Sequence, residues 1–281
     1  MTMLRTEGLA RDFGGVRAVD DLTFEIERGA VHSIIGPNGA GKTTLLNLLT
    51  GVYAPSAGRI YVDERDLTGR APHEFAARGV ARTFQNLQVF FNMSALENVM
   101  VGRHLREQRG LWAALLHTPR LAAGERAARA EARDLLASVG LQAWADAAAD
   151  ALPYGALKRL EIARALAARP RLLLLDEPAA GLNPTETTEI HALIAKLAGE
   201  GITVVLVEHN MQLVMGVSDR ILVLDYGRRL AEGAPEAVRN DPRVVEAYLG
   251  AEVHQEEARP EASLPWSRGA RGGLPPRVVD N

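Results

Sequence analysis

A glycine-rich loop between a short β-branched run and a leucine-rich segment constrains the fold of this 281-residue chain more than any other feature. The run Val31–Ile35 has the length and residue types of a buried strand. The segment Lys42–Leu49 then repeats leucine with helical spacing, at Leu45, Leu46, Leu48 and Leu49. The sequence therefore predicts a strand, a tight loop and a helix in succession.

The loop itself matches the phosphate-binding pattern G-x-x-x-x-G-K-S/T. Its residues are Gly36, Pro37, Asn38, Gly39, Ala40, Gly41, Lys42 and Thr43, with Thr44 following. Glycines let backbone amides wrap phosphate groups, and the N-terminus of the next helix adds partial positive charge. In such a loop Lys42 contacts the β and γ phosphates and the Thr43 hydroxyl binds magnesium, so we expect ATP and Mg²⁺ as ligands. Lysine supplies only three of the 32 basic residues, which makes a chance match rare.

Further apolar runs have the length of buried strands, at Leu172–Leu175, Ile202–Val207 and Ile221–Leu224. A helical stretch, Pro184–Leu197, separates the first two. Strands that alternate with helices are typical of an α/β fold with a parallel sheet. All of these runs are far shorter than the roughly 20 apolar residues that a membrane-spanning helix needs.

The run Leu172–Leu175 ends in two adjacent acids, Asp176 and Glu177. In a doubly wound fold they would lie at the carboxyl edge of the sheet, beside the phosphate-binding loop. Phosphoryl transfer is catalysed mainly by positioning and charge stabilisation, and it needs a metal ligand and a group that orients water. We expect Asp176 to bind magnesium, directly or through water, and Glu177 to act as the general base.

Composition excludes several other classes of function. The net charge of -3, with arginines spread among acids, argues against a nucleic-acid-binding surface. The absence of cysteine excludes disulfides and thiolate metal sites. The N-terminus lacks the charged-then-apolar pattern of a secretory signal, so we expect the chain to stay in the cytoplasm.

Two segments differ in composition from the rest. Between Glu97 and Ala149 alanine, arginine, glutamate and leucine dominate, which favours a helical insertion. The last stretch, Ala251–Asn281, is rich in proline, glycine and charged residues without periodicity, which predicts a disordered tail.

A third motif makes the resemblance to one family specific. The stretch Tyr154–Leu166 resembles the signature and helix of ATP-binding cassette (ABC) transporter ATPases, and it precedes Asp176 and Glu177 in that family's order. The resemblance covers about residues 3–250. It implies an α/β P-loop NTPase (RecA-like) core with an antiparallel β subdomain and an inserted α-helical subdomain at about residues 86–160. It also implies that residues 1–250 form one nucleotide-binding domain, followed by the tail 251–281.

Smaller motifs follow the same family order. Gln85 stands where the family has a glutamine that contacts magnesium and the attacking water, and His209 where it has a histidine that contacts the γ-phosphate. Gly181–Pro184 resembles the loop that the family places after the catalytic glutamate. Phe13 occupies the place of an aromatic residue that stacks on adenine, and a buried core phenylalanine is an equal alternative. A capping histidine and an ordinary loop glutamine are the alternatives for His209 and Gln85.

The signature departs from the family's usual L-S-G-G-Q and reads Leu152-Pro153-Tyr154-Gly155-Ala156. Proline at 153 supplies neither a hydroxyl nor an N–H donor. Gly155 and the amides of the following helix N-terminus remain to face a phosphate. We expect weakened activity at the ATP site that this signature completes.

The chain resembles the branch that serves importers of branched-chain and other hydrophobic amino acids. This resemblance is carried by three stretches, Ala81–Gln85, Glu177–Pro184 and Val207–Gly250, together with the long insertion between Gln85 and Leu152. In that branch a second ATPase subunit pairs with the first beneath two membrane permease subunits, and a binding protein outside the membrane delivers the amino acid. The resemblance thus implies a heterodimer at the cytoplasmic face of the inner membrane and no nucleic-acid partner.

Alternatives remain at this point. Lipopolysaccharide export and urea or amide import are alternatives within the transporter class. A soluble ABC ATPase that acts on ribosomes or DNA is an alternative of another class, although the single ATPase domain and the lack of sustained heptads disfavour it. A nucleotide-binding partner without ATPase activity is a third alternative, which Lys42, Asp176, Glu177 and His209 argue against.

Overall fold

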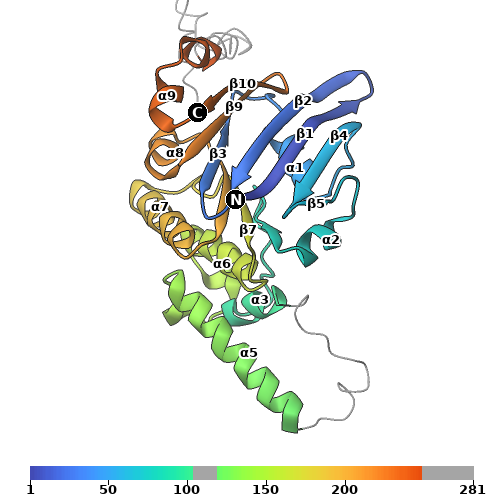
Figure 1. Ribbon diagram of the computed structural model, residues 1–281. Helices are drawn as coiled ribbons and strands as arrows, with labels where there is room; N and C mark the ends of the chain where they lie inside the picture. Colours follow the sequence, from blue (N-terminus) through green and yellow to red (C-terminus); the bar gives the residue numbers. More distant parts are fainter. Residues whose placement is uncertain (104–118, 249–281) are drawn as a thin grey trace, which may run out of the picture.

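Two β-sheets and a group of helices form the part of the chain that the computed structural model describes, residues 1–103 and 119–248 (Figure 1). The first sheet is antiparallel, in the order β2-β1-β4-β5. Its strands are β1 (Thr2–Phe13), β2 (Val16–Glu27), β4 (Ala57–Val62) and β5 (Arg65–Asp66). This sheet is the antiparallel subdomain that the family resemblance implied.

The second sheet has six strands in the order β10-β9-β3-β8-β7-β6. Neighbours from β9 to β6 pair in parallel, and β10 pairs antiparallel with β9. The strands are β3 (Val31–Ile35), β6 (Val80–Arg82), β7 (Leu172–Asp176), β8 (Thr203–Val207), β9 (Arg220–Asp225) and β10 (Arg228–Gly233). The expected parallel sheet is therefore confirmed.

Helices cover both faces of the parallel sheet. The helices are α1 (Lys42–Leu49), α2 (Pro72–Ala77), α3 (Ala95–Val101), α5 (Pro119–Ser138), α6 (Tyr154–Leu166), α7 (Pro184–Gly199), α8 (Met211–Val217) and α9 (Pro235–Arg239). Strand β7 shows why its sequence is continuously apolar. Leu173 and Leu175 pack into the core formed with α6 and α7, whereas Leu172 and Leu174 pack into the core shared with α1 and the antiparallel sheet.

The predicted helical insertion contains helices, but it is less helical than its composition suggested. Figure 1 shows α3, α5 and α6 together at one end of the molecule, away from the antiparallel sheet. Helix α5 ends at Ser138, and Gly140 follows with a φ of 75°, a conformation that few other residues adopt. Residues 139–153 then form turns, with two short 3₁₀ helices at Gln142–Trp144 and Ala149–Ala151. The predicted tail Ala251–Asn281 lies outside the described residues.

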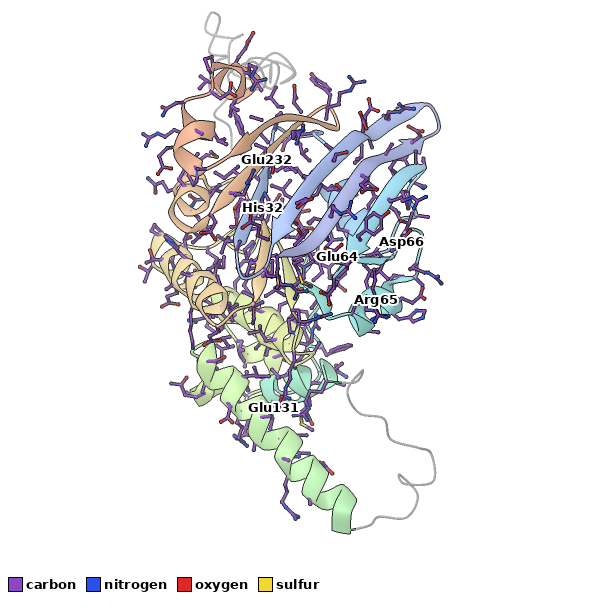
Figure 2. The ribbon with its side chains drawn as sticks, viewed as in Figure 1. His32, Glu64, Arg65, Asp66, Glu131 and Glu232 are labelled. Carbon is purple, nitrogen blue, oxygen red and sulfur yellow. The ribbon has the colours of Figure 1, made fainter. Side chains whose placement is uncertain are left out.

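Strand β3, which leads into the phosphate-binding loop, carries a buried histidine. Figure 2 labels His32 on this strand and Glu232 on β10. Burial lowers the pKa of His32 to about 4, although the negative charge of Glu232 opposes this shift. His32 is 1% exposed, and its Nε2 has no hydrogen-bond partner among the described residues. The imidazole is therefore neutral at physiological pH.

Candidate active site

The phosphate-binding loop connects β3 to α1 as the sequence predicted, and its glycines are required by close backbone contacts. Gly36 has a φ of 152°, and a Cβ there would lie 2.2 Å from the carbonyl oxygen of Leu224. Gly41 has a φ of 97° and caps α1, and a Cβ there would lie 2.4 Å from the carbonyl oxygen of Ala18. Backbone carbonyls of β2 and β9 thus lie so close to the loop that only glycine fits at these two positions.

Lys42 is held by its own loop. Its Nζ donates to the carbonyl oxygens of Gly36 at 2.6 Å and Pro37 at 2.9 Å, and the residue is 8% exposed. Burial lowers the pKa of Lys42, and the charges of Glu177 and Asp176 oppose that shift. The ammonium therefore lies in the field of the two acids that the sequence assigned to catalysis.

The two acids lie at the carboxyl end of β7, at the edge of the sheet where the loop begins. Asp176 is the last residue of β7 and is 4% exposed. Glu177 adopts a φ of 49°, which is unusual for a residue with a side chain, and its N–H donates to the carbonyl oxygen of Val207 at 2.8 Å. Strained backbone of this kind persists where the surroundings hold it, and it clusters at functional sites.

Two predicted site residues, Gln85 and His209, contact the carboxylate of a third, Glu177. Gln85 Nε2 donates to Glu177 Oε2 at 3.0 Å, and His209 Nε2 lies 2.8 Å from Glu177 Oε1. The Glu177 side chain is 16% exposed, and the His209 side chain is 44% exposed. The carboxylate is thus fixed on both oxygens by side chains that come from different loops.

Two residues that organise this edge, Arg82 and Glu208, were not predicted from the sequence. Arg82, the last residue of β6, donates to Asp176 Oδ2 at 2.8 Å and to Asn47 Oδ1 at 2.6 Å. Glu208 is 3% exposed and accepts the N–H of Ala179 at 2.8 Å and that of His209 at 3.0 Å. A sequence pattern could have identified Glu208, because it is an acid directly after an apolar strand. No pattern could have identified Arg82, because its partners are far away in sequence.

The remaining predicted residues lie outside this cluster or at its rim. Thr43 is exposed, Thr44 is half-buried, and Ala40 is buried inside the loop. Phe13 is 38% exposed, so it is not the buried core phenylalanine that was the alternative. Its ring meets Tyr53 edge-on at 5.3 Å, and the Arg11 guanidinium lies 4.6 Å from the ring centroid.

Gly155, the signature glycine, faces another part of its own chain. It lies in the first turn of α6, where a Cβ would meet the Glu186 carboxylate at 2.3 Å. Lys158, one turn later, donates to the carbonyl oxygen of Gln85 at 3.2 Å. Helix α6 is thereby tied to the loop that carries Gln85, although Gly155 is not among the residues that meet at Glu177.

The glycine contacts give a matched pair of variants. Gly39 also has a positive φ, 82°, but a Cβ there would meet nothing within 4 Å. We expect Gly39→Ala to lower the free energy of unfolding by about 1–2 kcal/mol, the cost of left-handed backbone for a residue with a Cβ. Gly41→Ala should cost clearly more, because its Cβ also collides with the backbone of β2. Urea titration measures both, and equal costs would contradict the close contact.

Comparison with known proteins shows the family to which the chain belongs. The ABC transporter family profile matches residues 19–180, and the profile of the branched-chain amino acid ATP-binding cassette transporter matches residues 228–254. The chain is 47% identical over 249 residues to the high-affinity branched-chain amino acid transport ATP-binding protein BraF of Pseudomonas aeruginosa, covering 88% of this chain and 98% of BraF. It is 45% identical to the corresponding LivG of Escherichia coli, with the same coverage.

A lipopolysaccharide export ATP-binding protein, LptB of Acidithiobacillus ferridurans, is 36% identical over 88% of this chain and 97% of its own length. Among solved structures, a nucleotide-free ABC transporter cassette has a TM-score of 0.77 at 33% identity and covers 88% of this chain and 99% of its own. A dimeric bacterial cassette has a TM-score of 0.71 at 26% identity and covers 83% and 99%. The chain belongs to the family of ABC transporter ATP-binding cassettes, which are ATPases.

Proposed function

We propose that this chain is the ATP-hydrolysing subunit of an importer for branched-chain or other hydrophobic amino acids. The observation that carries the hydrolytic part is the Glu177 carboxylate, which is fixed between Gln85 and His209 beside the phosphate-binding loop. The cargo is inferred from the relatives at 45–47% identity and from the family profile at residues 228–254. Lipopolysaccharide export has weaker support, because that relative is 36% identical.

Nucleotide would bind through the phosphate-binding loop, with Lys42 as the counter-charge of the phosphates. The loop carbonyls that now accept from Lys42 compete with the β and γ phosphates for the same ammonium. The buried position of Lys42 strengthens its attraction to phosphate, because the local dielectric constant is lower than that of water. Phe13, exposed at the end of β1, is the candidate for stacking on adenine.

The oxygen ligands at the sheet edge fit magnesium. Mg²⁺ prefers hard oxygen ligands and usually takes only one or two from the protein, the rest coming from phosphates and water. The described residues contain no group of three or more histidine, cysteine or acidic side chains that would form an all-protein metal site. Thr43, Asp176 and Gln85 are the candidates to hold the ion, which would supply charge stabilisation for the transferred phosphoryl group.

Glu177 is positioned to act as general base. Its two oxygens are oriented by Gln85 and His209, so the carboxylate does not have to be ordered when water arrives. His209 directly precedes Asn210, the N-cap of α8. Its backbone N–H donates to the carboxylate of the buried Glu208. We infer that His209 contacts the γ-phosphate and keeps Glu177 in its reactive orientation.

A second ATPase subunit is required to complete each ATP site in this proposal. The chain has one phosphate-binding loop and one signature, and within the chain Gly155 faces Glu186 and not that loop. The dimeric solved cassette supports pairing. Pro153 precedes α6 without a side-chain hydrogen bond to the helix N-terminus, so the ATP site it completes would be the weaker of two.

The permease subunits would dock in a groove between the parallel sheet and the helical part of the chain. This groove has a volume of about 610 Å³, and its walls include Phe84, Val89, Phe90 and Arg164. Phe84 is 41% and Phe90 43% exposed, and both line this groove, so they form an exposed apolar patch of the kind that marks interaction surfaces. No helix of the described residues is long and apolar enough to cross a bilayer. We infer peripheral association at the cytoplasmic face from the relatives, which are ATP-binding proteins of amino acid transport.

The catalytic assignment is tested with three variants. Lys42→Ala should abolish measurable ATP binding, because the phosphates lose their buried counter-charge. Glu177→Gln should bind ATP normally but hydrolyse it about 100-fold more slowly or worse, which is the usual contribution of a general base. Glu200→Gln, the same substitution at the C-terminal end of α7, is the control and should match the wild type in both assays. Unchanged hydrolysis by Glu177→Gln would refute the assignment.

The docking groove is tested by co-purification. Phe90→Asp places a charge in the apolar wall and should prevent recovery of the permease subunits with the chain. Cells that carry this variant should also lose uptake of labelled leucine. Trp144→Asp is the control, since Trp144 is also exposed in the helical part but does not line the groove. Normal recovery of the permease with Phe90→Asp would place docking elsewhere.

A further inference from the structure

The Arg82 guanidinium lies between the proposed docking groove and the catalytic edge of the sheet. Arg82 and Asp176 form an ion pair at 2.8 Å whose two side chains are each 6% exposed. The other terminal nitrogen donates to Asn47 Oδ1 on α1. Within the described part of the chain Arg82 Nε is buried and has no partner. The guanidinium is therefore held mainly by Asp176 and Asn47.

On its other side the guanidinium contacts the groove. Its central carbon lies 5.0 Å from the centroid of the Phe84 ring, within the range of a cation–π interaction. Both Arg82 and Phe84 line the groove. A half-exposed aromatic ring is thus only one side chain away from the buried Asp176 carboxylate.

Arg82 and magnesium would compete for this carboxylate. In the structure Asp176 is neutralised by the guanidinium, and it is also the acid proposed to hold Mg²⁺. A guanidinium and a divalent cation beside one carboxylate repel each other, and this repulsion is large at a site so far removed from water. The position of Arg82 therefore sets how readily Asp176 accepts the metal.

We propose that Arg82 is a positioning residue that couples the groove to the metal site: support from the Phe84 ring holds Arg82 on Asp176, and displacement of that ring by a docked permease segment releases Asp176 for Mg²⁺. This coupling rests on the proposed function, because it assumes MgATP at the sheet edge and a permease in the groove. It is reciprocal, since a change in metal affinity caused by the groove requires an equal change in docking affinity caused by the metal.

The test measures the Mg²⁺ concentration that half-saturates binding of a fluorescent, non-hydrolysable ATP analogue to the chain alone. Phe84→Leu keeps an apolar side chain but removes the aromatic face beneath the guanidinium. We expect it to lower the half-saturating Mg²⁺ concentration about twofold to fivefold, which corresponds to the loss of one exposed cation–π interaction. Phe91→Leu is the control, because Phe91 is 48% exposed in the same stretch but does not line the groove, and it should leave the value unchanged.

A double-mutant cycle shows whether Phe84 acts through Arg82. Arg82→Met should lower the half-saturating concentration further than Phe84→Leu, and in the Arg82→Met background Phe84→Leu should have no additional effect. Arg82→Gln, which also removes the positive charge but keeps hydrogen-bond donors, replaces Arg82→Met in the cycle if the latter does not fold. Metal-free unfolding midpoints of all variants identify changes due to stability alone.

The outcomes separate the inference from the proposed function. An unchanged or raised Mg²⁺ requirement in Phe84→Leu overturns the inference, and so does an effect of Phe84→Leu that persists in the Arg82 variant. Both results leave the proposed function intact, provided that the wild-type chain binds the analogue in a Mg²⁺-dependent way. Failure of the wild type to bind it at all contradicts the proposed function itself.

Discussion

Parallel pairing of β3 with β8 and of β8 with β7 is the constraint on which the whole site depends. Parallel strands end at the same edge of a sheet, so this pairing brings together Gly36 after β3, Glu177 after β7 and Glu208 after β8. The backbone N–H of Glu177 continues the pairing by donating to Val207 at the end of β8. Residues separated by up to 172 positions thus reach one site without any contribution from the helical insertion.

Charge balance is the second organising feature of that edge. Lys42 and Arg82 are two buried cations beside two acids, Asp176 and Glu177, and each cation also has neutral oxygen partners from the loop or from α1. Such an arrangement tolerates burial of charge because every charged group has a partner. It also means that nucleotide and metal enter a site whose charges are already paired, so binding must exchange partners and not merely fill an empty space.

The sequence predicted the central elements well and the connecting contacts poorly. The bounds of β3 and α1 follow from the β-branched run and the leucine spacing, and β7 and β8 follow from apolar runs whose two faces are both covered. The antiparallel sheet was expected only from the family resemblance, because β1 and β2 are interrupted by register shifts and mix charged with apolar residues. Arg82 could not be identified, since Asn47 and Asp176 are 35 and 94 positions away and no local pattern connects them.

We propose that two cassettes enclose ATP between the phosphate-binding loop of one and the signature of the other. The most direct measurement is the molar mass of the Glu177→Gln protein by light scattering, with MgATP, alone and together with its co-expressed partner ATPase. Slow hydrolysis should trap an ATP-dependent dimer, so the 30.3 kDa chain should move into a species with the combined mass of two subunits. A protein that binds MgATP but remains a monomer under both conditions would contradict the account.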